Sequence, residues 1–290
     1  MYKSLRLAAA LGALAVAGAC SSSSPGAGHD PHVEVAAAFY PLQYVTEQVG
    51  GDHVHVENLV KPGAEPHDLE MSPQQMVRLS DAGLVVYLAG FQPNVDQAVA
   101  TQAKDHALDV ASVVQQLGNK DPHIWLDPTR LATVADAVAA RLGKADAGHA
   151  AEFTKNAAAL RKKLTTLDGE YRTGLANCAS RSIVTSHEAF GYLADRYKLR
   201  QVGITGLNPD SEPTGTRLAE VAKIAKAEKA KVIFFETLVS PKIAETLASE
   251  VGARAEKLDP LEGLEARSKG DYISVMRSNL TALRSALGCR

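Results

Sequence analysis

The sequence has few aromatic residues, almost no net charge and few cysteines. Only 5% of its 290 residues are Phe, Trp or Tyr, which argues against a surface on which bases or sugars stack. The 31 Lys and Arg residues nearly balance the 33 Asp and Glu residues, so the basic surplus typical of nucleic-acid-binding domains is missing. With 46% hydrophobic and 22% charged residues, the composition is that of an average soluble protein, and the length suggests one large or two ordinary domains.

Common enzyme motifs are also missing from the sequence. His187-Glu188 lacks the second histidine of the H-E-x-x-H metalloprotease motif, and neither a G-x-S-x-G nucleophile motif nor a phosphate-binding glycine-rich loop is present. The sequence therefore offers no direct support for a hydrolase or a nucleotide-binding enzyme.

Residues 1–20 have the pattern of an export signal. Two basic residues precede a short apolar run, Leu7–Val16, which is too short to span a bilayer. The segment ends in small residues before Cys20 and resembles the lipobox of bacterial lipoproteins, in which the cysteine is diacylated; an ordinary cleaved signal is the alternative. The Ser- and Gly-rich residues 21–32 would form a flexible tether. We therefore expect an exported protein, periplasmic or extracellular, anchored through Cys20 to the outer face of the membrane.

If Cys20 carries lipid, two cysteines remain. Cys178 and Cys289 form an even pair in a compartment where thiols tend to oxidise, so we predict a disulfide between them. Two free thiols are the alternative.

Apolar, strand-like runs alternate with helical segments along the chain. This alternation predicts an α/β fold with parallel sheets. The predicted strands are Val33–Phe39, His53–Val60, Gly83–Ala89, Ile124–Leu126, Ser182–Ser186, Gln201–Thr205, Lys231–Glu236 and Arg254–Leu258.

The middle of the chain differs, because residues 149–177 carry no strand signal. Apolar residues recur there at intervals of three and four, which predicts one long helix with a single buried face, unless it breaks near Gly169. These residues are Phe153, Ala157, Leu160, Leu164, Leu167 and Tyr171. We therefore divide the exported chain into an N-terminal lobe (33–147), a linking helix (148–178) and a C-terminal lobe (179–290).

Four polar residues stand at the edges of predicted elements. His67 lies in a Pro- and Gly-rich loop, His123 precedes an apolar run, and His187 and Asp259 each follow a predicted strand. Ligands of open α/β sheets bind at the carboxyl ends of strands, so two facing lobes could bring all four together. Three imidazoles and one carboxylate suit tetrahedral Zn²⁺.

Four segments resemble the signature regions of the metal-binding lipoproteins that serve ABC importers for zinc and manganese. They occur in the family's order, and the resemblance covers nearly all of residues 33–288. The segments are Pro66-His67-Asp68, Pro122–Pro128, Ser186–Leu193 and Leu258–Leu261. The resemblance implies two Rossmann-like lobes joined by a long rigid helix, with the metal in the cleft between them. Its ligands here would be His67, His123, His187 and Asp259.

The third ligand favours zinc. Manganese-type members of the family have Glu where His187 stands, and imidazole suits Zn²⁺ better than Mn²⁺. Many zinc-type members also carry a His-rich loop before the second ligand, whereas residues 101–120 here contain only His106. The departure argues against a metal-collecting role for this loop and does not bear on the main site. A manganese or iron carrier is the alternative within the same family.

We expect a monomeric carrier that captures Zn²⁺ and delivers it to the permease of an ABC importer. Four protein ligands leave no open position for water or substrate, which argues against an enzyme. A zinc hydrolase and a surface adhesin are the rival hypotheses. Two acidic residues, Glu188 and Glu236, could orient a ligand from the second coordination shell or could be ordinary loop acids.

Overall fold

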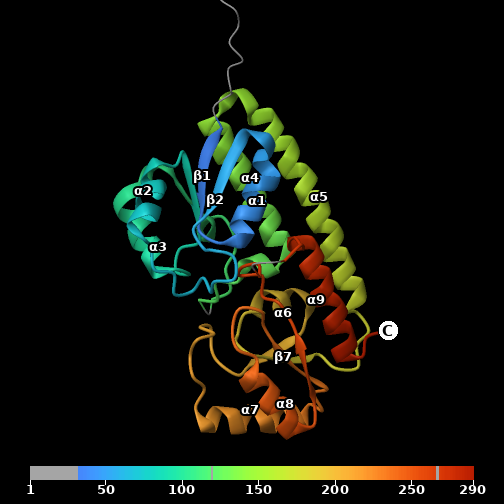
Figure 1. Cartoon of the computed structure of the whole chain (residues 1–290). Helices are drawn as coiled ribbons and strands as arrows, with labels where there is room; N and C mark the ends of the chain where they lie inside the picture. Colours follow the sequence, from blue (N-terminus) through green and yellow to red (C-terminus); the bar gives the residue numbers. More distant parts are fainter. Residues whose placement is uncertain (1–31, 119, 266–267) are drawn as a thin grey trace, which may run out of the picture. The chain divides into compact units, whose positions relative to one another are not determined.

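The computed structural model describes residues 32–290 except 119 and 266–267, and its first half builds a four-stranded parallel sheet (Figure 1). The strand order is β2-β1-β3-β4. The strands are β1 (Val33–Ala37), β2 (Val54–Asn58), β3 (Leu84–Tyr87) and β4 (Ala107–Asp109). The helices of this half are α1 (Tyr40–Gly50), α2 (Pro73–Asp81), α3 (Pro93–Ala98) and α4 (Pro128–Ala145).

The second half repeats this topology in the order β6-β5-β7-β8, again with parallel strands. The strands are β5 (Ser182–Thr185), β6 (Arg200–Gly203), β7 (Val232–Phe235) and β8 (Arg254–Lys257). The helices are α6 (Gly191–Tyr197), α7 (Gly215–Ala227), α8 (Lys242–Val251) and α9 (Tyr272–Leu287). The predicted α/β fold with two parallel sheets is therefore confirmed.

One predicted strand is wrong. Residues Ile124–Leu126 form the 3₁₀ helix η5, and the fourth strand of the first sheet is β4. All three residues of η5 are buried, and a short apolar run of this kind fits a strand or a buried helical turn equally well. Strand β4 escaped prediction because only its central residue, Leu108, is buried, so it has no apolar run.

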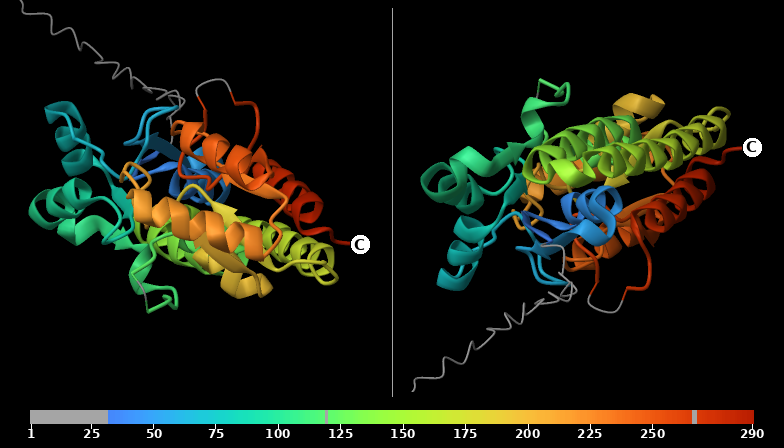
Figure 2. Two further views of the ribbon diagram at one scale, coloured as in Figure 1. Left: turned by 90° about the horizontal axis from the view of Figure 1, so that it is seen from below. Right: turned by 90° about the horizontal axis from the view of Figure 1, so that it is seen from above.

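Helix α5 (Ala150–Gly174) is the long helix expected between the two halves, and it continues through Gly169 without a break. The predicted apolar stripe is its buried face. Its first part meets α1, where Asn156 donates a hydrogen bond to the Val49 carbonyl, and its last part meets α9, where the Tyr171 hydroxyl donates to the Met276 carbonyl. Figures 1 and 2 show the helix lying along the first half of the fold and reaching α9 of the second half. It therefore links the two halves through packing contacts with both.

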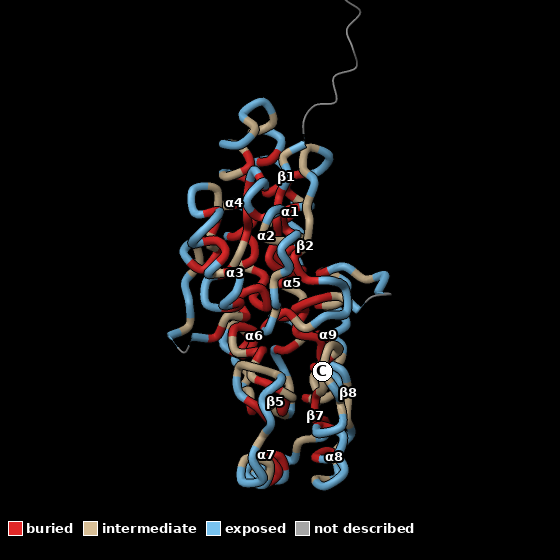
Figure 3. Tube along the Cα trace, turned by 60° about the vertical axis from the view of Figure 1, so that its left-hand side comes forward, coloured by how far each residue is buried: buried red, intermediate tan, exposed pale blue. Residues whose placement is uncertain are grey.

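One hydrophobic cluster contains buried residues from both halves, and a second, smaller cluster lies within the second half. Figure 3 shows buried segments in each half. The indole nitrogen of fully buried Trp125 donates to the Pro260 carbonyl over 2.7 Å, and the Tyr272 hydroxyl donates to the Trp125 carbonyl over 2.6 Å. Residues 32–290 form one compact unit, so the lobe boundaries at 147/148 and 178/179 stay a prediction. Within the described residues, no helix has the length and apolar composition needed to cross a membrane.

Cys178 and Cys289 form the predicted disulfide. The two cysteines also pair as a short antiparallel bridge just beyond the ends of α5 and α9, so the covalent bond ties these two helix ends together. The predicted signal peptide (1–20), the lipidation site Cys20 and all of the tether but His32 lie outside the described residues.

Candidate metal centre

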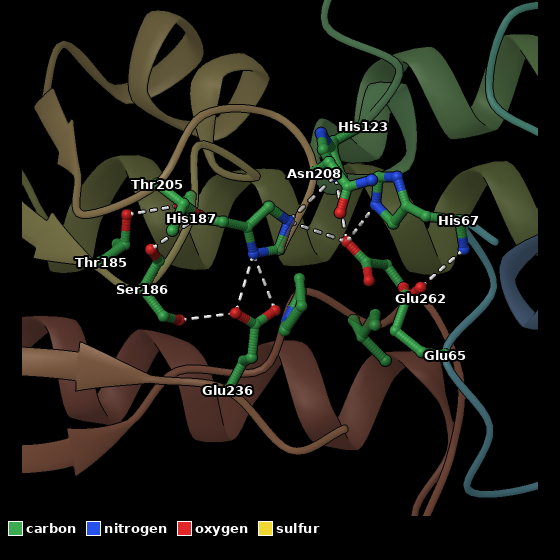
Figure 4. Close-up of polar contacts among 12 residues, drawn as sticks. Glu65, His67, His123, Thr185, Ser186, His187, Thr205, Asn208, Glu236 and Glu262 are labelled. Carbon is green, nitrogen blue, oxygen red and sulfur yellow. Dashed lines mark hydrogen bonds and ion pairs between the residues drawn. The ribbon is translucent and has the colours of Figure 1, made fainter. Parts of the chain in front are cut away.

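Three histidines and one glutamate converge from four loops that follow parallel strands (Figure 4). His67 lies in the loop between β2 and α2, and His123 directly precedes η5. His187 comes two residues after β5, and Glu262 lies in the loop after β8. Residues of both halves thus meet where ligands of parallel α/β sheets bind. All four are buried, with exposed fractions of 8%, 0%, 1% and 1%.

The donor atoms of this group face one another. The Oε1 atom of Glu262 lies 3.4 Å from Nε2 of His67, 3.0 Å from Nε2 of His123 and 3.1 Å from Nε2 of His187. The Nε2 atoms of His123 and His187 are 3.4 Å apart. Four ligand atoms within 4.8 Å of one another can hold a metal ion, and three imidazoles with one carboxylate are a donor set that zinc accepts.

The carboxylate of Asp259, which we expected to be the fourth ligand, does not belong to this group of side chains, whereas that of Glu262 does. The Oδ1 atom of Asp259 accepts a hydrogen bond of 2.8 Å from the backbone N–H of Leu261. Its own backbone N–H and carbonyl are both bound by the side chain of Asn279. The carboxylate of Asp259 therefore shapes the loop that carries Glu262.

The turn after Pro260 explains why Glu262, and not Asp259, lies among the imidazoles. Leu261 has a left-handed backbone with φ of 58°, which is uncommon outside glycine and occurs at functional sites. The carboxylate of Asp259 caps that turn, and Glu262 follows it with only 1% of its surface exposed. The sequence signal for Glu262 was a second acid three residues after Asp259 in the same loop, but spacing alone could not choose between the two.

Two of the imidazoles also bind a buried carboxylate through Nδ1. His123 Nδ1 lies 2.7 Å from Oδ1 of Asp121, which the sequence analysis did not single out. His187 Nδ1 lies 2.8 Å from both carboxylate oxygens of Glu236. Such contacts fix the tautomer that leaves Nε2 free for a metal. Glu188, the other acid considered for this role, instead faces Arg217 at 3.8 Å and is about half exposed.

The charges of the site compensate one another. Burial by itself lowers the pKa of His123 and of His187. Hydrogen bonds to Asp121 and Glu262 outweigh this effect and raise the pKa of His123. Glu236 and Glu262 likewise raise the pKa of His187 to about 10. Burial by itself raises the pKa of Glu262, yet the three imidazoles hold it well below its usual value. The cluster therefore favours positive charge beside the carboxylate, and a metal ion must displace protons from the same atoms.

Comparison with known proteins agrees with this centre. The family model described as "Zinc-uptake complex component A periplasmic" matches residues 35–286. The high-affinity zinc uptake system protein ZnuA of Bacillus subtilis is 35% identical over 296 residues, covering 93% of each chain. The zinc-binding lipoprotein AdcA of Streptococcus pneumoniae is also 35% identical, over 92% of this chain but only 57% of its own length.

Solved structures show the same fold. The Zn(II)-bound ZnuA-like domain of Streptococcus pneumoniae AdcA superposes with a TM-score of 0.78 at 36% identity, covering 88% of this chain and 99% of that domain. The laminin-binding protein Lmb of Streptococcus agalactiae, described as having adhesin and metal-transporting activity, gives a TM-score of 0.82 at 33% identity over 88% and 99% of the two chains.

The resemblance inferred from the four motifs is thereby confirmed, and the zinc hypothesis is favoured over the manganese and adhesin alternatives. The buried group of three histidines and one glutamate agrees with Zn²⁺ as the ion bound. The chain belongs to the ZnuA family of periplasmic zinc-uptake proteins, which are solute-binding proteins of transport systems rather than enzymes.

Proposed function

We propose that this protein captures Zn²⁺ outside the cytoplasm with His67, His123, His187 and Glu262, and delivers it to the permease of an ABC importer. The observation that carries the proposal is the convergence of three Nε2 atoms on one carboxylate oxygen in a buried centre. Zinc bound by all four protein donors would have no coordination position left for a substrate water, which supports a carrier over a hydrolase.

The donor set also supports zinc over manganese as the cargo. Three imidazole nitrogens suit the borderline Zn²⁺ ion, whereas Mn²⁺ prefers oxygen ligands. Titration of the metal-free protein with Zn²⁺, and with Mn²⁺ in competition, tests this assignment. We expect Zn²⁺ to displace Mn²⁺ completely at equal concentrations, and preferential retention of Mn²⁺ would contradict the proposal.

Delivery can be tested in cells from which the gene has been deleted. We expect uptake of radioactive zinc to return with the wild-type protein and not with His187→Ala, because that variant loses one ligand from the C-terminal half. Equal uptake with both proteins would show that this centre does not serve import. Phe190→Leu, a volume change at a buried position three residues after His187 in the sequence, controls for nonspecific effects on the fold.

We further propose that the protein is a monomer anchored to the outer face of the membrane through lipidated Cys20. The AdcA relatives named as lipoproteins support the anchor. A Cys20→Ala variant is expected to leave the membrane fraction, and mass spectrometry of the wild-type N-terminus is expected to find a diacylated cysteine. Retention of the variant in the membrane fraction would contradict the anchor.

A further inference from the structure

Besides the candidate ligands, the centre contains a contact that crosses between the two halves of the fold. We propose that Asp121 is a positioning residue for His123, and that its own position depends on the absence of a side chain at Gly191, the first residue of α6. This inference rests on the proposed zinc site and adds to it two residues that touch no metal.

Asp121 holds His123 at two points. Its Oδ1 atom accepts a hydrogen bond of 2.9 Å from the backbone N–H of His123 and lies 2.7 Å from Nδ1 of the imidazole. The side chains of both residues are at most 1% exposed, so water cannot replace this acceptor. With Nδ1 carrying the proton, Nε2 presents its lone pair to the centre. The imidazole therefore keeps the tautomer and orientation that a zinc ligand needs.

Gly191 belongs to the other half of the fold, yet it lies against this carboxylate. A β-carbon at position 191 would overlap the Oδ2 atom of Asp121. The backbone of Gly191 is not left-handed, so alanine fits the local conformation, and only the carboxylate stands in its way. The glycine is therefore needed for space and not for backbone freedom.

The neighbouring residue of α6 binds the same segment. The hydroxyl of Tyr192 accepts a hydrogen bond of 3.0 Å from the backbone N–H of Leu117, and the guanidinium of Arg130 lies over the Tyr192 ring at 4.7 Å. The start of α6 thus contacts the chain on both sides of the turn that leads to His123. Helix α6 belongs to the second half of the fold, and His123 belongs to the first. The orientation of a ligand from the first half therefore depends on a helix of the second half.

A double-mutant cycle tests the inference, with zinc affinity measured by competition with a chromophoric chelator. Removing a group that orients a ligand typically weakens metal binding by about 10- to 100-fold, which we expect for Asp121→Ala. Asp121→Asn keeps an oxygen acceptor and is expected to recover most of this loss. Gly191→Ala is expected to weaken binding at least about 10-fold in the wild type and less than about twofold on Asp121→Ala, because the overlapping carboxylate is then gone.

The matched control is Gly215→Ala, at the first residue of α7, where an added β-carbon meets no atom within 4 Å. Its zinc affinity is expected to equal that of the wild type. The visible absorption of bound Co²⁺ supplies a second measurement, since a displaced imidazole changes the bands whereas a loss of stability alone does not. We expect altered bands in Gly191→Ala and unaltered bands in Gly215→Ala.

Each outcome decides the inference. Equal losses from Gly191→Ala in both backgrounds, or unchanged affinity in Asp121→Ala, would overturn it. If Asp121→Ala does not fold, Gly191→Ala and Asp121→Asn carry the test, and wild-type affinity with wild-type Co²⁺ bands in Gly191→Ala would refute the positioning role. Failure of the wild-type protein to bind zinc, or full binding by His123→Ala, would instead refute the proposed ligand set.

Discussion

The choice between Glu262 and Asp259 as the fourth ligand can be tested with two isosteric variants. Glu262→Gln removes the charge that faces three Nε2 atoms, while Asp259→Asn removes a charge that caps a turn. Both substitutions keep the size of the side chain and one carbonyl oxygen. Only the first should strongly affect zinc binding, because only the Glu262 carboxylate lies among the imidazoles.

The expected magnitudes follow from burial and from hydrogen bonding. Glu262 is 1% exposed, and removing one partner of a buried charge pair costs about 3–5 kcal/mol, which corresponds to roughly 100- to 4,000-fold weaker zinc binding. In Asp259→Asn the amide oxygen still accepts from the Leu261 N–H, so the loss should stay near that of one weakened hydrogen bond, about 1 kcal/mol or about fivefold.

Competition against a chelator of known zinc affinity, at one pH and one ionic strength, measures both variants on the same scale. Thermal unfolding of the metal-free proteins shows whether either substitution disturbs the fold itself. A larger affinity loss in Asp259→Asn than in Glu262→Gln would refute the assignment and return the fourth position to Asp259.

Three further predictions concern the disulfide, a buried carboxylate and the tryptophan beside the site. Replacing Cys178 and Cys289 with serine should lower the free energy of unfolding by up to about 4–5 kcal/mol, because the disulfide closes a loop of 111 residues; equal urea midpoints would contradict this. Asp168→Asn should lower the free energy of unfolding by about 1–3 kcal/mol, because buried Asp168 accepts hydrogen bonds from Arg196 and from the Tyr197 hydroxyl. The control Asp136→Asn, in the exposed ion pair with Arg161, should lower it by about 1 kcal/mol or less in the same urea titration. The single tryptophan, Trp125, has its ring 5.1 Å from that of His123, so its fluorescence should change with zinc and remain constant in His123→Ala; a constant wild-type signal would contradict the site.

The fold was predictable where the sequence pattern reports burial directly. Helix α5 shows one apolar stripe, and its members are the buried face of the helix. Seven of the eight predicted strands lie where the structure has them. The central strands β3 and β7 are apolar and mostly buried, as parallel strands covered on both faces are, whereas the edge strands β2 and β8 carry polar residues and are only partly buried. The exceptions are short: η5 is apolar but lies between two prolines, and β4 has a single buried residue. In elements of three residues, tertiary packing decides the conformation and periodicity carries no information.

The histidines of the site were predictable for a different reason. His67, His123 and His187 each stand where a strand or loop meets the next element, and their sequence motifs mark them individually. The carboxylates that contact Nδ1 of two of these histidines were harder to predict. Glu236 directly follows β7 and was proposed from the sequence, but Asp121 precedes a proline in a loop, and only folding places its carboxylate against Nδ1 of His123.

The fourth ligand shows most clearly what a sequence leaves undetermined. Asp259 and Glu262 occupy one loop after β8, both are buried, and either carboxylate suits zinc chemically. They differ because Leu261 has a left-handed backbone, and its N–H donates a hydrogen bond to the carboxylate of Asp259. That carboxylate therefore binds the turn and not the imidazoles. Nothing in the residue types requires this turn, because leucine seldom adopts it. The conformation of one residue thus decides which acid faces the imidazoles, and Asp259 serves the site by supporting the turn from which Glu262 reaches it.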